Sequence, residues 1–139
     1  MALDFTNLNW VAVVAAAVAG VVIGFIWYMP QVFGRRWAAE SGQELPEGMS
    51  GVGMSMLVGT IVVPLVVAYA LAVLMKGLGA ASIVDGLVVG LVVWLGFAAA
   101  PAVNNVLYEK RSWMYWAIGV GFALVSLLAM GAIIGYLGA

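Results

Sequence analysis

The chain has 139 residues, of which 66% are hydrophobic and 8% are charged, and its formal net charge is −1. Soluble domains carry about 25% charged residues, so this composition excludes a water-soluble globular fold, and the near-zero charge offers no basic surface for nucleic acid. Cysteine and histidine are both absent, so we expect no disulfide, no metal centre and no cofactor held by those side chains.

The positions of the charged residues divide the chain into membrane spans. Every acidic and basic residue lies outside four uncharged stretches, at 5–34, 48–75, 86–108 and 112–139. Each stretch exceeds the about 20 apolar residues that cross a bilayer core of about 30 Å as a helix. The sequence therefore predicts an all-α polytopic membrane protein, in which residues 1–139 form a single domain of four transmembrane helices arranged as two helical hairpins. We expect the spans near 9–30, 52–76, 83–103 and 113–137.

The first span is expected to be retained rather than cleaved as a signal peptide. The residues before it include Asp4 but no lysine or arginine, and the apolar run from Trp10 to Met29 is long for the core of a signal peptide. Pro30, which follows this run, is a helix breaker and is expected to end the span.

The segment after the first span carries apolar and basic side chains together. Val32, Phe33 and Trp37 share one helical face beside Arg35 and Arg36. Two interpretations fit this pattern, namely a short interfacial helix or a turn whose arginines extend to the membrane surface.

A polar loop at 40–50 leads into the second span. Pro64 lies inside this span and is expected to kink or loosen the helix, because proline removes one backbone hydrogen bond. Residues 76–79 read Lys-Gly-Leu-Gly, a sequence that favours the end of a helix.

The third span has a recognisable start and an uncertain end. Ser82 and Asp85 suit the cap and the first turn of a helix. Pro101 lies near the expected end and is predicted to bend the helix.

Small residues recur at a spacing of four in three of the spans. In lipid, helices associate through close backbone approach, because the hydrophobic effect no longer drives them together. These stripes therefore predict tight helix contacts, either within the chain or between subunits: Ala12, Ala16, Gly20 and Gly24; Gly86, Gly90, Ala98 and Ala102; Gly119, Ala123, Gly131 and Gly135.

The basic residues predict the orientation in the membrane. Cytoplasmic flanks are enriched in lysine and arginine, and the connections after spans one and three hold four such residues, against Lys76 alone after span two. We therefore expect these two connections in the cytoplasm, and both termini outside. Aromatic side chains near the span ends are expected to anchor the helices at the membrane interfaces: Trp27, Tyr28, Trp37 and Trp113.

Few polar groups lie at bilayer depth. Thr60, Tyr69, Trp94 and Ser126 are the main ones, and no ionisable acid or base falls in mid-span. Ion-coupled transporters usually need such a group within the membrane, so a proton-coupled mechanism is disfavoured. We expect the mid-span hydroxyls to bond backbone carbonyls rather than a substrate.

The densest polar cluster follows the third span and has two interpretations. It is either a binding site for a headgroup or small molecule, through Asn105 and Glu109, or a structural latch in which Glu109 pairs with an arginine of the other cytoplasmic connection. The cluster has no nucleophile beside a base, so we expect no enzyme. The candidate residues are Asn104, Asn105, Tyr108, Glu109, Arg35 and Arg36.

Several motifs resemble one bacterial family. They are Asn9-Trp10, then Trp27-Tyr28-x-Pro30-x-x-Phe33-Gly34-x-x-Trp37, Trp94-Leu95-Gly96-Phe97, Asn105-x-Leu107-Tyr108-Glu109, and the run from Ser126 to Gly135. This combination resembles the "domain of unknown function 1761" family over nearly the whole chain; one departure is Asn104, where the family pattern has threonine. The resemblance implies a small four-span integral membrane protein of bacteria, located in the bacterial cytoplasmic membrane, and implies no activity.

Three roles remain open from the sequence. The first is an oligomeric transport or lipid and small-molecule binding protein, indicated by the glycine stripes, the prolines and the polar cluster. The second is a structural or accessory subunit of a larger membrane complex, indicated by the apolar spans and short connections. The third, a membrane enzyme, has no catalytic constellation to support it. The expected partners are membrane lipid and either further copies of the chain or a larger membrane protein.

Overall fold

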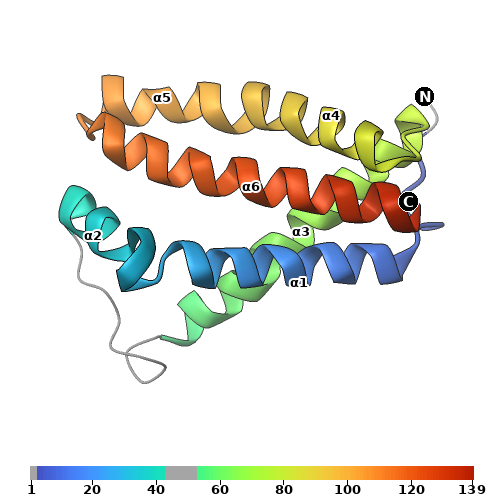
Figure 1. The fold of residues 1–139 in the computed structure, drawn as a ribbon, viewed down its shortest axis with the longest axis horizontal. Coiled ribbons are helices and arrows are strands. Elements are labelled where there is room, and N and C mark those ends of the chain that lie inside the picture. Colours follow the sequence, from blue (N-terminus) through green and yellow to red (C-terminus); the bar gives the residue numbers. More distant parts are fainter. Residues whose placement is uncertain (1–2, 43–52) are drawn as a thin grey trace.

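The computed structural model describes residues 3–42 and 53–139 (Figure 1). Within these residues, four helices are long and apolar enough to cross a membrane. They are α1 (Trp10–Trp27), α3 (Met54–Leu78), the continuous helix of α4 (Ile83–Trp94), η3 (Leu95–Ala99) and α5 (Ala100–Leu107), and α6 (Trp113–Leu137). The expected all-α, four-span class is confirmed. Val52, where the second span was expected to begin, and residues 43–50 of the expected loop lie outside the described residues.

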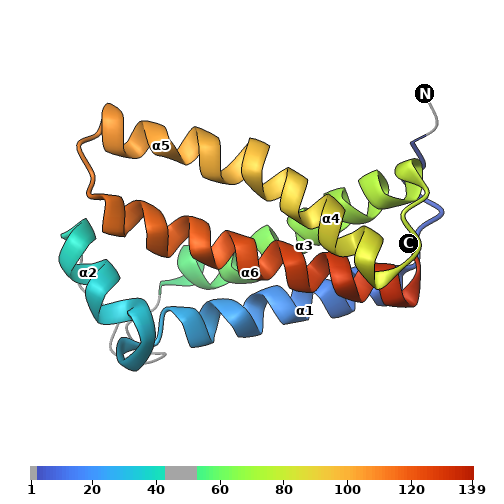
Figure 2. The same cartoon turned by 45° about the horizontal axis from the view of Figure 1, so that its top comes forward.

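The helices pack as two sequential hairpins around α6. α1 contacts α3 and α4 contacts α6, while α6 also packs along α1 and so lies at the centre of the bundle. Both termini lie at one end of the bundle, and the short helix α2 (Arg35–Ser41) lies at the other end with the α5–α6 turn (Figures 1 and 2).

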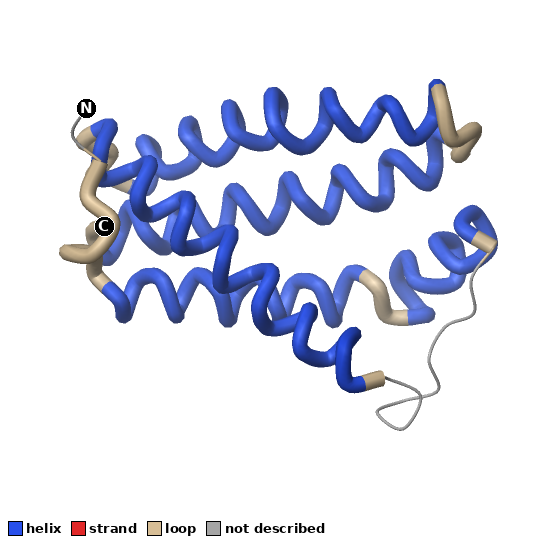
Figure 3. Tube along the Cα trace, turned by 180° about the vertical axis from the view of Figure 1, so that it is seen from behind, coloured by secondary structure: helices blue, strands red, loops and turns tan. Residues whose placement is uncertain are grey.

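Only the second half of α3 belongs to the core. Figure 3 shows α3 crossing the other helices obliquely, so that its first half diverges from the bundle. Its buried residues begin at Ala68 and continue to Met75, whereas Met54 and Val63 are exposed. Lipid is the natural solvent for these exposed apolar side chains. α3 remains α-helical through Pro64.

Local capping explains where the third span begins and the second ends. The Ser82 hydroxyl accepts a hydrogen bond from the Asp85 N–H at 3.1 Å, which satisfies one of the free donors in the first turn of α4. Gly79 ends α3 in the left-handed conformation, at φ 70°, and its N–H bonds the last carbonyls of the helix. Both features were expected from the sequence.

The segment after α1 is a short helix, which resolves one open alternative. A π-helical turn, η1 (Pro30–Gly34), leads into α2, which ends at Gly42 with φ 73°. Gly34 is buried against the backbone of Tyr28 and Met29, where a Cβ atom has no room. This contact explains why glycine follows Phe33 in the motif.

The third span continues past Pro101, and the bend expected there stays a prediction. The helix continues to Leu107, beyond the expected end at 103, because the π-helical turn η3 precedes the proline. In this wider turn the Ala100 N–H reaches back five residues, to the Leu95 carbonyl. Such a turn accommodates a residue that lacks an N–H donor without breaking the helix.

Glycines bring α4 and α6 into direct backbone contact. A Cβ atom on Gly86 would collide with the Gly131 carbonyl, and one on Gly135 with the Ser82 carbonyl. A Cβ atom on Gly90 would lie 2.6 Å from the Leu127 carbonyl oxygen. The expected glycine contacts on these two spans are therefore made within the chain.

This contact leads to a stability prediction. Gly86→Ala is expected to lower the free energy of unfolding by about 1–3 kcal/mol, because the methyl group forces two backbones apart. Gly119→Ala is the matched control, since a Cβ atom there meets nothing within 4 Å. Alanine normally favours a helix over glycine by about 0.5–1 kcal/mol, so this control should be neutral or stabilising. Thermal unfolding in detergent measures both variants, and equal effects would contradict the glycine contact.

Candidate binding cavity between α5 and α6

Beyond the glycine contacts, the third span and α6 separate (Figure 2). A cavity of about 230 Å³ lies between α5 and α6, near α2 and the end of α1. Small residues from the two predicted stripes form its floor, and aromatic and amide side chains complete it. The lining residues are Tyr28, Trp37, Ala98, Ala102, Asn105, Tyr115, Trp116, Gly119, Val120 and Ala123.

Three tryptophans bridge the helices around this cavity. The Trp94 indole donates to the Val120 carbonyl at 2.7 Å, and the Trp116 indole donates to the Ala99 carbonyl at 3.1 Å. Trp27, at the end of α1, donates to the carbonyl of Ile118 at 2.9 Å. These bonds satisfy the indole donors and hold the helices at a set separation.

Four other polar side chains line the cavity with unused hydrogen-bonding capacity. The Tyr28 and Tyr115 hydroxyls, the Trp37 indole and the Asn105 amide have no hydrogen-bond partner within residues 3–42 and 53–139. All four residues are half-buried. Their polar atoms are accessible and can therefore form hydrogen bonds with a molecule that enters the cavity.

Aromatic contacts position two of these side chains. The Tyr28 ring lies edge-on to Trp37, with 5.9 Å between ring centroids, and edge-on to Phe122 at 5.5 Å. Edge-to-face contacts of this kind are favoured by the charge distribution of aromatic rings. Tyr28 thus connects α2 with α6 across the end of α1.

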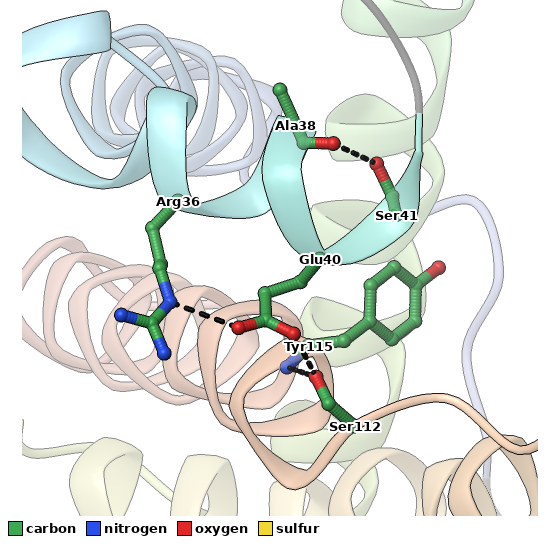
Figure 4. Close-up of polar contacts among 6 residues, drawn as sticks. All are labelled: Arg36, Ala38, Glu40, Ser41, Ser112 and Tyr115. Carbon is green, nitrogen blue, oxygen red and sulfur yellow. Dashed lines mark hydrogen bonds and ion pairs between the residues drawn. The ribbon is translucent and has the colours of Figure 1, made fainter.

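A polar latch joins α2 to the α5–α6 turn (Figure 4). Glu40 forms an ion pair with Arg36 at 3.0 Å and accepts a hydrogen bond from the Ser112 hydroxyl at 2.6 Å. Arg111 donates to the Ser41 carbonyl at 3.0 Å, and its guanidinium carbon lies 5.2 Å from the centroid of the Tyr115 ring. The two connections are therefore fastened together beside the cavity.

The predicted pairing of Glu109 with Arg35 or Arg36 is wrong. In the described part of the chain the ion pairs are Arg36–Glu40 and Lys76–Asp4, and Glu109 is exposed. After α5 the backbone reverses direction, and the Arg111 N–H donates a hydrogen bond to the Asn105 carbonyl at 2.9 Å. The turn therefore directs Arg111 toward α2, whereas Glu109 stays outside.

The remaining predicted site residues are separated by the fold. Asn105 lines the cavity, whereas Asn104 is exposed and Tyr108 is 81% exposed. Arg35 is also exposed. The sequence did carry signals for the missed latch residues, because Ser112 precedes an apolar helix as a cap would, and Glu40 lies four residues after Arg36.

The predicted interface anchors differ in their placement. Trp113 is 58% exposed, as an anchor in the headgroup region would be. Trp27, Tyr28 and Trp37 are half-buried and contact other parts of the protein. Their main contacts are thus within the bundle.

The mid-span hydroxyls behave as expected in two cases. Thr60 donates to the Met56 carbonyl and Tyr69 to the Phe5 carbonyl, both at 2.8 Å. Ser126 is buried, and its hydroxyl has no partner among the residues that the structure describes. Those residues also contain no cluster of three or more acidic, histidine or cysteine side chains that could hold a metal ion.

Four helices that are long and apolar enough to cross a membrane, with a short helix beside them, define a small, all-helical integral membrane protein. A family model described as "Protein of unknown function (DUF1761)" matches residues 11–135, nearly the whole chain. The chain belongs to this family, whose description assigns no activity. No curated protein and no solved structure matches it.

The latch leads to a prediction about pH. The hydrogen bond from Ser112, followed by Arg36, holds the pKa of Glu40 below its ordinary value of 4.5, although burial opposes the shift. A carboxyl whose pKa is lower in the folded state stabilises the fold above its unfolded pKa, and this contribution is lost as the pH falls through the folded value.

Glu40→Gln should therefore reduce stability at pH 7 and make it less sensitive to acid between pH 7 and pH 3. Denaturation in detergent across this range measures the effect. The matched control is Glu109→Gln, which removes an exposed carboxylate from the same end of the bundle. Parallel pH profiles for the two variants would count against the latch.

Proposed function

We propose that the protein binds a small molecule in the cavity between α5 and α6. One observation carries this proposal: four half-buried polar side chains line a cavity of about 230 Å³ and make no hydrogen bonds to the described residues. An engineered cavity of about 150 Å³ in another protein holds benzene. The cavity volume therefore suits a molecule of one or two rings.

The arrangement around the cavity favours a binding site over a packing defect. The small residues Ala102 and Gly119 would permit α5 and α6 to approach closely, as Gly86 and Gly131 permit for α4. Instead, the hydrogen bonds of Trp94 and Trp116 join α4 and η3 of the third span to α6, beside the open space. Empty volume weakens packing, so a cavity maintained by bonded tryptophans is consistent with an occupant.

The chemistry of the lining supports binding without catalysis. Tyrosine, tryptophan and asparagine supply the polar atoms, and no carboxylate, lysine, histidine or thiol is among the lining residues. General acid–base or nucleophilic catalysis needs a group whose pKa is near the working pH. A binding or passage role requires only shape and hydrogen bonds.

The proposed site lies at the cytoplasmic end of the bundle. α2 and the α5–α6 turn, which carry four of the five basic residues, lie together at one end (Figure 1). Lys76 lies at the end of α3, paired with Asp4 at 3.5 Å. This distribution supports a cytoplasmic position for α2 under the positive-inside rule.

Orientation can be tested with single cysteines, because the natural chain has none. A membrane-impermeant maleimide applied to intact bacteria should label Thr6→Cys, which is exposed near the N-terminus, and should leave Glu109→Cys unlabelled until the cells are opened. The reverse labelling pattern would place the cavity at the outer face.

The binding proposal can be tested with a cavity-filling substitution. Gly119→Leu places a side chain in the cavity where a Cβ atom meets no neighbour within 4 Å. We expect benzamide to bind the natural protein in lipid nanodiscs, and Gly119→Leu to weaken this binding at least tenfold. Isothermal titration measures the affinity, with empty nanodiscs as the blank.

The matched control is Gly59→Leu, which adds the same side chain at an open position on α3, away from the cavity. It should bind benzamide as the natural protein does. Equal binding by all three proteins would show that the probe enters lipid rather than the cavity.

A further inference from the structure

Four of the ten residues that line the cavity are aromatic. Tyr28, Trp37, Tyr115 and Trp116 come from the end of α1, from α2 and from the start of α6, and together they line one space. Aromatic rings pack well against other rings in offset or edge-on arrangements. A flat aromatic molecule therefore matches these walls better than a branched aliphatic one.

The unused polar atoms are rich in donors. The Trp37 indole can only donate, the Asn105 amide has two N–H donors, and the hydroxyls of Tyr28 and Tyr115 can donate or accept. None of the four is bonded within the described residues, and an oxygen acceptor on a ligand is the group that each of them can donate to. An ammonium ion would leave the Trp37 donor without a partner.

The charges beside the cavity favour an anion. Arg111 lies over the ring of Tyr115, with 5.2 Å from its guanidinium carbon to the ring centroid. The neighbouring carboxylate, Glu40, is already occupied by Arg36 and Ser112. The charge of Arg111 lies next to Tyr115, which lines the cavity, and no carboxylate is among the lining residues. A positive charge in this position raises the affinity of the cavity for a negative group.

These three features together assign a ligand class. On the basis of the proposed binding function, we propose that the cavity takes a one- or two-ring aromatic carboxylate. Its ring lies between the aromatic walls and its carboxylate accepts hydrogen bonds from the unused donors. Arg111 contributes through its charge, from its position over the ring of Tyr115.

Three compounds of similar shape test the charge preference. Benzoate, benzamide and benzylammonium present the same ring with a negative, neutral and positive substituent at pH 7. Titration of the natural protein in nanodiscs of neutral lipid should rank them in this order, with benzoate at least tenfold tighter than benzylammonium. Gly119→Leu, as before, identifies the part of the signal that comes from the cavity.

A matched pair of variants tests the source of the preference. Arg111→Gln should weaken benzoate binding at least fivefold and leave benzamide binding within twofold of the natural protein. Lys110→Gln removes an exposed cation from the adjacent position and should change neither. Arg111 also holds α2, so preserved benzamide binding shows that the cavity of the variant is intact.

The possible outcomes distinguish a failure of the aromatic-carboxylate ligand class from a failure of the proposed binding function. If benzylammonium or benzamide binds as tightly as benzoate and Gly119→Leu abolishes that binding, the cavity is a binding site and the aromatic-acid class is wrong. If Arg111→Gln and Lys110→Gln weaken benzoate binding equally, the role of Arg111 is wrong. If no compound gives a signal that depends on Gly119, the binding function itself is wrong.

Discussion

The direct contact between the backbones of α4 and α6 is the constraint on which the rest of the structure depends. Gly86 and Gly131 leave no space for a Cβ atom, and Gly90 and Gly135 make similar contacts along the same two helices. In lipid, apolar side chains gain nothing from leaving the solvent, so close packing must hold helices together. This contact makes α6 the central helix, and α1 packs against another of its faces.

The glycine contact between α4 and α6 at one end of the bundle is linked to the cavity between α5 and α6 at the other end. Two helices that touch at their glycines and cross at an angle must separate further along, and here they separate toward α5 (Figure 2). Where the backbones no longer touch, the indoles of Trp94 and Trp116 join them by hydrogen bonds to carbonyls. The same pair of helices thus provides both the rigid end of the bundle and a lined cavity beside the latch.

The extents of the helices were largely predictable, because each boundary has a local cause. Ser82 supplies the cap of α4 and Gly79 ends α3, both recognisable from residue type. The third span continues through Pro101 to Leu107, past its expected end near 103, since η3 provides a wider turn before the proline. For the candidate site, Asn105 was among the predicted residues, whereas Tyr115 and Trp116 were missed because aromatic residues at the start of a span resemble membrane anchors.

The sequence by itself determined that the protein crosses a membrane four times, because charged side chains cannot be spread along helices that face hydrocarbon. Only the tertiary structure decided which small residues touch. Gly86 and Ala102 belong to the same stripe, yet one meets a backbone and the other lines a cavity. It likewise decided that Glu40, and not Glu109, joins the two connections. Spacing along one helix shows which residues share a face, but the crossing of two helices sets the distance between their faces.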